Sequence, residues 1–223
     1  MMQGTLVNAA AILVGGMIGA VSKKALKDST SHTILQGIGL VVFLIGAQMA
    51  FEATNILVIL ITVVLGALIG ETIRIHDHMH TLGRQLEKRF SGHSIATGFV
   101  TASILFCVGS MSILGPIQSG VEGIHTILYL KAVIDFVVAL VLASTLGIGV
   151  VLSAVSVLLF QGSITLLAGL FEPLITPMMM SDINAVGGLL ILTIAINMFV
   201  PDKIRTANFL PSVFLVIVYH LIR

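Results

Sequence analysis

Long apolar stretches follow one another along the whole chain and limit what it can fold into. A helix needs about 20 apolar residues to cross the hydrocarbon core of a bilayer. Backbone polar groups in lipid must bond within their own segment, and the alternating polarity of β-barrel strands is absent. We therefore predict an all-α, polytopic helical membrane protein with about eight transmembrane helices. The eight segments are 4–22, 33–51, 55–73, 94–115, 125–146, 149–170, 183–200 and 207–222.

The composition agrees with lipid as the main solvent of this chain. Charged residues make up 9% of it, whereas soluble domains contain roughly 25%. A net charge of +1 argues against nucleic acid as a partner, because nucleic-acid binders are usually strongly basic. The sequence has no Walker A motif, no H-E-x-x-H helix and no Ser/His pair at matching membrane depth. We therefore expect no enzymatic activity, no cofactor and no metal site.

The basic residues predict how the chain is inserted. When the loop at 23–27 is placed in the cytoplasm and the segments alternate, most Lys and Arg residues fall inside, as the positive-inside rule requires. The inside residues are Lys23, Lys24, Lys27, Arg74, Arg84, Lys88, Arg89, Lys203 and Arg205. We predict a multi-pass protein with both its N-terminus and its C-terminus outside. The first segment has no basic stretch before it, so we expect it to be retained rather than cleaved as a signal peptide.

Residues 74–93 form the longest polar stretch, and apolar side chains recur in it at helical spacing. These are Ile75, Met79, Leu82, Leu86 and Phe90. The pattern predicts a cytoplasmic amphipathic helix that lies on anionic lipid, with its basic residues at the headgroups. Just before this stretch, Glu71 and Arg74 are expected to pair at the membrane boundary.

Two parts of the chain resemble each other. Residues 39–49 align without a gap with residues 188–198, and residues 4–11 align more faintly with 149–156. One interpretation is an inverted three-helix repeat with units 4–73 and 149–222, joined by linking spans at 94–146, as in many secondary transporters. The other interpretation is a chance alignment of helices rich in Gly, Ala and Leu. Under both, residues 1–223 form a single transmembrane domain.

Asp135 is the carboxylate expected deepest in the membrane. Lys131 lies four residues before it, which places both side chains on one face of a helix. A charge at this depth costs at least about 2.5–3.5 kcal/mol, so it needs a reason. The functional interpretation is that Asp135 binds a cation or carries a proton, with Lys131 as its counter-charge. The structural interpretation is a pair that satisfies itself and fixes the helix.

Uncharged polar groups could complete a site around this pair. The amides Asn8, Gln36 and Gln161 lie beside small residues and are predicted to supply neutral oxygens to a cation; interhelical hydrogen bonding is the alternative. The fourth segment is rich in Gly and Ser near its outer end, which predicts a half-helix that lines the pathway; an ordinary helix ending at Pro116 is the alternative. The predicted pathway residues are Gly109, Ser110, Gly115, Pro116 and Gln118.

Glycines at other positions predict close helix packing. Gly15, Gly16 and Gly19 lie in the first segment, and Gly66 and Gly70 form a G-x-x-x-G motif in the third. Small residues of this kind allow two helix backbones to approach in a membrane.

Several long motifs together resemble a known family. They are GTLVNAAAILVGGMIG at the N-terminus, LGALIGE at the end of the third segment, FVTASILFCVGSMSILGPIQSG in the fourth, and KAVIDFVVALVLASTLGIGVVLSAVSVLLFQGSITLLAG across the fifth and sixth. The sequence resembles the bacterial membrane family catalogued as domain of unknown function 554. The resemblance implies a helical protein of the bacterial cytoplasmic (inner) membrane and carries over no functional residue. A glycine is expected after the span-five aspartate, where this chain has Phe136; the larger side chain could narrow access to Asp135.

These observations predict a secondary transporter or channel-like permease for a small ion or solute. Asp135 is the expected charged centre, and a cation or proton is favoured because this group is negative. A non-transporting membrane scaffold or regulatory subunit is the alternative function. The predicted partners are the lipid bilayer and the small ion or solute, and formation of a homo-oligomer is left open.

Overall fold

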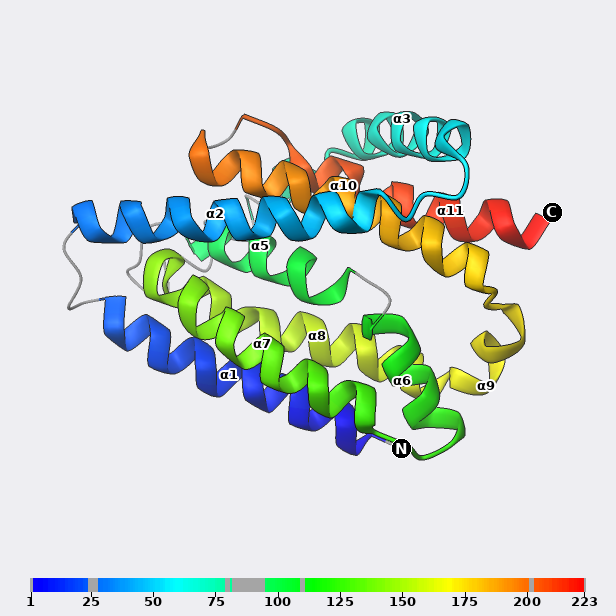
Figure 1. The fold of residues 1–223 in the computed structure, drawn as a ribbon, viewed down its shortest axis with the longest axis horizontal. Coiled ribbons are helices and arrows are strands. Elements are labelled where there is room, and N and C mark those ends of the chain that lie inside the picture. Colours follow the sequence, from blue (N-terminus) through cyan, green and yellow to red (C-terminus); the bar gives the residue numbers. More distant parts are fainter. Residues whose placement is uncertain are drawn as a thin grey trace. The chain divides into compact units, whose positions relative to one another are not determined.

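The chain folds into helices, as its apolar segments predict. The computed structural model describes residues 2–23, 28–78, 81, 95–108, 111–200 and 203–222, and within these it contains α-helices and short 3-10 turns but no strand (Figure 1). The elements are α1 (Gln3–Lys23), α2 (Asp28–Ala50), α3 (Ile56–Ile73), α5 (Ile95–Cys107), α6 (Met111–Val121), α7 (Thr126–Leu146), α8 (Gly149–Leu166), α9 (Ala168–Phe171), η1 (Glu172–Leu174), α10 (Pro177–Phe199), η2 (Thr206–Phe209) and α11 (Pro211–Ile222). The predicted all-α class is confirmed.

Within the described part of the chain, six helices are long and apolar enough to cross a membrane: α1, α2, α3, α7, α8 and α10. The bent pair α5 and α6 adds a seventh crossing if it counts as one span. The prediction of about eight is therefore too high by this measure. The predicted eighth segment, 207–222, is divided because η2 ends at Phe209 and α11 starts at Pro211. Proline fits the first turn of a helix and lacks the N–H that would continue a preceding one.

The predicted fourth segment breaks into two helices whose axes differ by 58°. The break lies between Cys107 and Met111, so Gly109 and Ser110 fall outside the described residues. The Ser112 hydroxyl donates to the Phe106 carbonyl at 2.7 Å and satisfies one acceptor at the end of α5. Pro116 lies inside α6. The alternative of an ordinary helix ending at Pro116 is wrong, since α6 continues to Val121.

The chain forms two compact units. The first comprises residues 1–35 and 82–173, and the second comprises 36–81 and 174–223, so that α2 contributes to both. These units do not follow the predicted repeat boundaries, and the inverted repeat stays a prediction. Of the predicted amphipathic helix at 74–93, residues 75–78 and 81 are helical, and residues 79–80 and 82–93 lie outside the described part of the chain.

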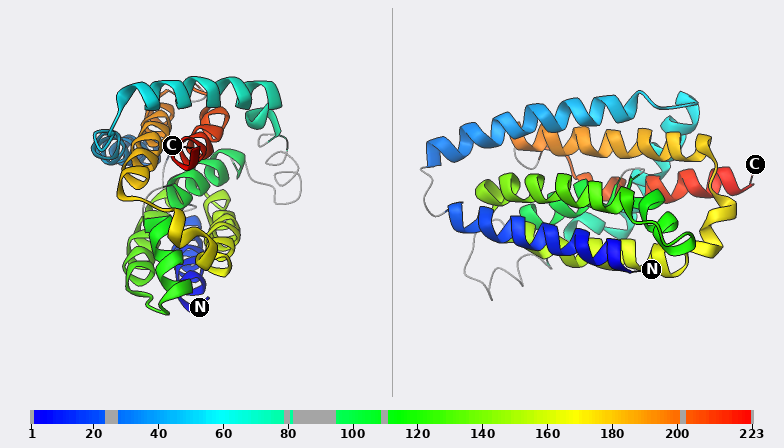
Figure 2. Two further views of the ribbon diagram at one scale, coloured as in Figure 1. Left: turned by 90° about the vertical axis from the view of Figure 1, so that its right-hand side faces the viewer. Right: turned by 60° about the horizontal axis from the view of Figure 1, so that its bottom comes forward.

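The helices of the first unit lie close together (Figure 2), and several of their contacts are made at glycines. A Cβ at Gly15 would collide with the Phe136 carbonyl, and one at Gly19 would collide with the Leu140 carbonyl. The two helices therefore run parallel, with α1 against α7. Gly16 faces Val151, near the start of α8, so α1 and α8 run antiparallel. The prediction that these glycines mark close packing is confirmed.

The same unit shows how a single glycine separates the predicted fifth and sixth segments. Gly147 adopts a positive φ of 79° and ends α7, with its N–H bonded to the Ala143 carbonyl. Glycine enters this region without a Cβ penalty. The next helix, α8, begins at Gly149, where a Cβ would collide with the Ile95 carbonyl.

The second unit is held by polar contacts at both helix ends. At one end, Asp182 accepts from Thr54 at 2.8 Å and contacts His220 Nε2 at 2.9 Å. At the other, Arg205 bonds to Glu71 at 2.7 Å. The predicted Glu71–Arg74 pair is therefore wrong; Glu71 instead pairs with the more distant Arg205.

Close packing also joins α3 to η2 and α11 in the second unit. The third helix meets the C-terminal segment where Gly66 faces Ser212 and Gly70 faces the Asn208 carbonyl. Neither glycine leaves room for a Cβ, so the predicted packing role of this G-x-x-x-G motif is confirmed. Together with the end contacts, this packing makes α3 antiparallel to α11. The chain directions within each unit agree with the alternation of segments that the sequence predicts.

Candidate functional site: a buried polar cluster between α1, α7 and α8

The ion pair predicted in the fifth segment forms in the middle of α7. The Lys131 ammonium lies 2.9 Å from Oδ1 and 2.8 Å from Oδ2 of Asp135. Only 8% of the Lys131 side chain and 5% of the Asp135 side chain are exposed. The helical spacing of four residues brings the two groups together. Asp135 is also the only acidic residue within α1, α5, α6, α7 and α8.

Two of the three predicted amides meet next to this pair. Asn8 Nδ2 donates to Gln161 Oε1 at 3.2 Å across the antiparallel α1–α8 contact, and both side chains are fully buried. The Asn8 side chain also lies beside the Asp135 carboxylate. The parallel packing of α1 on α7 explains this, because Gly4 faces Leu128 and Gly15 faces Phe136. We call Asn8, Lys131, Asp135 and Gln161 the buried polar cluster.

The cluster contains polar atoms that other described residues do not satisfy. Asn8 Oδ1 and Gln161 Nε2 are buried and have no hydrogen-bond partner there. Asp135 Oδ2 contacts the Lys131 ammonium but receives no well-aligned hydrogen bond from the described residues. Leaving a buried polar atom unpaired costs about 1–3 kcal/mol. The two unpaired amide atoms, on α1 and α8, therefore form with the Asp135 carboxylate on α7 a place where a small polar or charged species would be stabilised.

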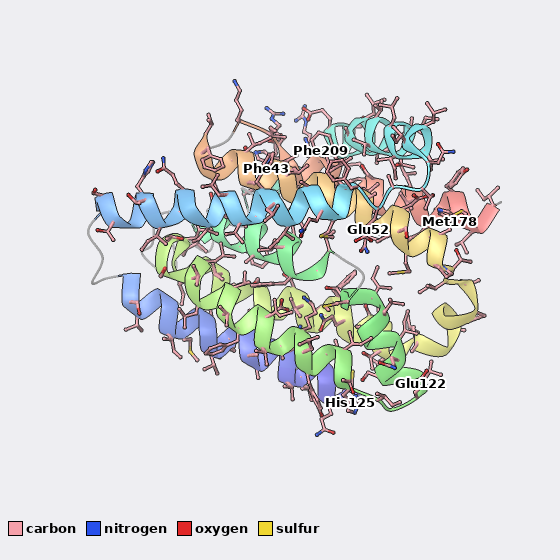
Figure 3. The ribbon with its side chains drawn as sticks, in the orientation of Figure 1. Phe43, Glu52, Glu122, His125, Met178 and Phe209 are labelled. Atoms are coloured by element: carbon pink, nitrogen blue, oxygen red, sulfur yellow. The ribbon has the colours of Figure 1, made fainter. Side chains whose placement is uncertain are left out.

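The surroundings of the cluster differ in the two directions along α1. Toward the start of α1, a Thr5–Thr165 hydroxyl contact of 3.1 Å lies one turn away, and both side chains are buried. Farther along, the Ser119 hydroxyl contacts His125 Nδ1 at 2.8 Å beside the α6–α7 turn, where Figure 3 labels His125. In the opposite direction the fully buried side chains include Ile12, Leu142, Val150 and Val157. The buried hydroxyls there, such as those of Thr145 and Ser153, bond to carbonyls of their own helices.

The remaining predicted residues lie elsewhere. Gln36 belongs to the second unit and is exposed. Gly115 is buried against Leu128 of α7, and Pro116 is buried in α6. Gln118 donates to Glu122 at 3.2 Å, at an exposed position. Gly109 and Ser110 lie outside the described residues. The structure therefore brings together Asn8, Lys131, Asp135 and Gln161 of the predicted site.

Thr5 and Thr165 were not among the site residues that the sequence predicts. A signal was present, because Thr5 lies three residues before Asn8 and Thr165 lies four residues after Gln161. Both spacings put the threonine on the same helix face as its amide. The matching 3–4 residue spacing on two helices could have indicated that they share an interface.

Comparison with known proteins identifies the family. The family described as "Protein of unknown function (DUF554)" matches residues 3–221. The chain belongs to this family. It is 33% identical to the "Uncharacterized membrane protein YdfK" of Bacillus subtilis (strain 168) over 95% of this chain and 92% of that protein. It is 31% identical to the "Uncharacterized protein YqgA" of Escherichia coli (strain K12) over 96% of this chain and 94% of that protein.

No solved structure matches the chain. Membership of the family confirms the resemblance seen in the sequence motifs. Together with the apolar helices, it identifies the chain as a multi-pass membrane protein.

Proposed function

We propose that this protein is a cation permease whose buried polar cluster binds a small cation in exchange for a proton. One observation carries the proposal: among the described residues, two buried amide atoms without a hydrogen-bond partner, Asn8 Oδ1 and Gln161 Nε2, belong to the same cluster as Asp135, the only acidic residue within α1, α5, α6, α7 and α8. A cluster that served only to fix the helices would be expected to satisfy its own hydrogen bonds, because buried polar groups generally do. Asn8 Oδ1 and the Asp135 carboxylate offer oxygen ligands to a cation that has lost its water, and Gln161 Nε2 is a donor that can hold a water or a carboxylate oxygen beside it.

The Lys131–Asp135 contact suggests how binding and proton release are linked. An entering cation takes the place of the ammonium at the Asp135 oxygens, with Asn8 Oδ1 as a neutral ligand. Lys131 then faces a cation in a low-dielectric site, and its ammonium gives one proton to water. The site gains one positive charge and loses one, so its net charge stays at zero. Cation entry and proton exit are therefore coupled one to one.

The arrangement of charges at the ends of the second unit supports the predicted orientation. Glu52 and Asp182 lie at one end, through contacts of Glu52 with Asn184 and of Asp182 with Thr54. Arg205 lies at the other end with Glu71. We propose that the Arg205 end faces the cytoplasm, in agreement with the positive-inside rule. Because the named relatives are bacterial, the proposed location is the bacterial cytoplasmic membrane. Both termini are placed outside, with η2 and α11 counted together as the last crossing, since they run from the Arg205–Glu71 contact to the His220–Asp182 contact at the other end.

The first prediction concerns Asp135→Asn in proteoliposomes that contain a trapped pH dye. An external pulse of Na⁺ or K⁺ should change the internal pH with the native protein and leave it at the level of protein-free vesicles with the variant. The amide keeps the shape of the carboxylate and removes the charge that binds the cation. Glu122→Gln is the matched control, because it removes an exposed carboxylate at the α6–α7 turn. Equal flux in native protein and Asp135→Asn would exclude this mechanism.

A non-transporting scaffold is the second candidate function, and one observation favours it. Both Asp135 oxygens lie within 2.9 Å of the Lys131 ammonium, and both side chains are almost fully buried. A pair of this kind can have a purely structural role, in which it fixes the position of α7 and takes no part in transport. Absence of cation-dependent flux in the native protein, together with a cluster that water does not reach, would favour this function.

Cysteine labelling tests whether water reaches the cluster. In a Cys107→Ser background, Thr5→Cys should react with a membrane-impermeant thiol reagent added on the side of the α1 N-terminus. Ile12→Cys is the matched control on the same face of α1, and it should not react because this position is packed among apolar side chains. Labelling followed by mass spectrometry measures both. Protection of position 5 in the folded protein and its reaction after denaturation would favour the scaffold.

A further inference from the structure

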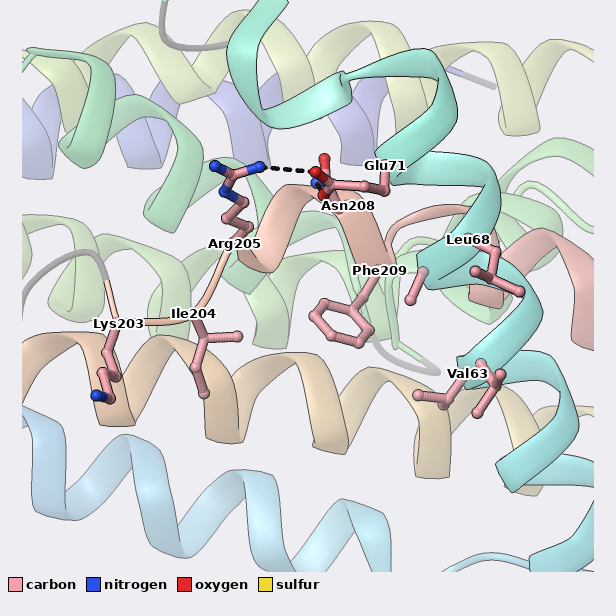
Figure 4. A pocket seen from close by; sticks show the side chains of 10 residues that line it. Val63, Leu68, Glu71, Lys203, Ile204, Arg205, Asn208 and Phe209 are labelled. Atoms are coloured by element: carbon pink, nitrogen blue, oxygen red, sulfur yellow. Dashed lines mark hydrogen bonds and ion pairs between the residues drawn. The ribbon is translucent and has the colours of Figure 1, made fainter.

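A separate cavity lies in the second unit, at the end of α3 (Figure 4). Its volume is about 540 Å³. The wall is apolar and includes Val63, Val64 and Leu68 of α3, together with Phe209 of η2. The rim is polar and contains Glu71, Lys203 and Arg205. The cavity therefore joins an apolar wall to a charged edge.

The rim has a net positive charge. Arg205 bonds to Glu71 at 2.7 Å through one nitrogen, and Asn208 donates to the other oxygen of Glu71 at 2.5 Å. More than half of each of the Glu71 and Arg205 side chains is exposed, so this pair is weak and can rearrange. Lys203 is also exposed. Two cations and one carboxylate leave a charge of +1, and the Arg205 guanidinium has further N–H donors for an anion.

The wall and the rim together select the class of ligand. In a membrane protein, an apolar surface such as Leu68, which is 60% exposed, faces acyl chains. The rim lies at the polar end of α3, where the apolar span ends at Ile73 and where we place the headgroups of the bilayer. Basic residues between helices at that level attract anionic headgroups. A soluble anion would use the cations but would gain nothing from the apolar wall.

We propose that this cavity binds an anionic phospholipid, with its phosphate on Lys203 and Arg205 and an acyl chain along α3. The site is distinct from the buried polar cluster and does not depend on the proposed permease activity. Glu71 holds Arg205 at the rim when the lipid is absent.

The test measures lipid binding to the purified full-length protein in detergent. Native mass spectrometry, with phosphatidylglycerol and phosphatidylcholine titrated separately, should give tighter binding of phosphatidylglycerol. The double variant Lys203→Gln/Arg205→Gln should weaken phosphatidylglycerol binding about thirtyfold, because each basic residue near anionic lipid contributes about 1 kcal/mol. Phosphatidylcholine binding should stay the same.

Two further variants make the result specific. Arg74→Gln removes an exposed cation near the end of α3 that does not line the cavity, and it should leave binding unchanged. Ala67→Phe fills the apolar wall without a change in charge and should weaken binding of phosphatidylglycerol. Equal binding of the two lipids, an equal loss in Arg74→Gln, or equally tight binding of glycerol phosphate without acyl chains would each overturn the proposal. The last result would indicate a site for a free anion.

Discussion

Replacing Lys131 with Met should destabilise the protein by about 3–5 kcal/mol, because the change removes one partner of a buried ion pair. Asp135 would then keep a charge without a counter-ion, or take up a proton, at a position where only 5% of its side chain is exposed. Met has nearly the length of Lys, so little packing is lost. The measurement is the midpoint of thermal unfolding in detergent, followed by size-exclusion chromatography.

The double variant Lys131→Met/Asp135→Leu is the control for this prediction. Removal of both charges leaves no unpaired ion, so its stability should return to within about 1 kcal/mol of the native protein or exceed it. The double variant should also lack cation flux although it is folded, which separates the structural role of the pair from its proposed transport role. If the single and double variants are equally unstable, the pair does not stabilise α7 through its charges.

Replacing Gly19 with Leu should separate α1 from α7 and prevent assembly of the first unit. A Cβ at this position would collide with the Leu140 backbone carbonyl, and a backbone cannot move aside as a flexible side chain can. Overpacking of a core commonly costs 1–3 kcal/mol, and about 3 kcal/mol or more is expected here because the contact is with the backbone. The yield of monodisperse protein and its unfolding temperature measure the effect.

Gly37→Leu is the matched control for the packing prediction. No atom lies within 4 Å of a Cβ at Gly37, so this change should leave the unfolding temperature unchanged or raise it slightly, since Leu favours a helix more than Gly does. A similar loss in both variants would mean that a general effect of leucine, rather than the α1–α7 contact, explains the result.

The helical fold could be read from local properties of the sequence. Bilayer thickness sets the length of an apolar helix, so each span can be recognised from a window of about 20 residues. The Lys131–Asp135 pair is equally local, because four residues on a helix place two side chains together. The break between Cys107 and Met111 and the turn at Gly147 also follow from nearby residues. The helix boundaries of the final segment were harder to predict. Its hydropathy is continuous along the chain, but α11 starts at Pro211 and divides the apolar run.

Only the tertiary structure decided which polar groups meet. Asn8 and Gln161 are 153 residues apart in sequence yet form a hydrogen bond, whereas Gln36, which looked equivalent in the sequence, is exposed. Glu71 pairs with Arg205 rather than with nearby Arg74. Hydropathy defines the position of a helix along the chain but leaves its rotation and its neighbours open. These depend on close backbone contacts such as Gly15 on Phe136, which join segments that are far apart in the sequence.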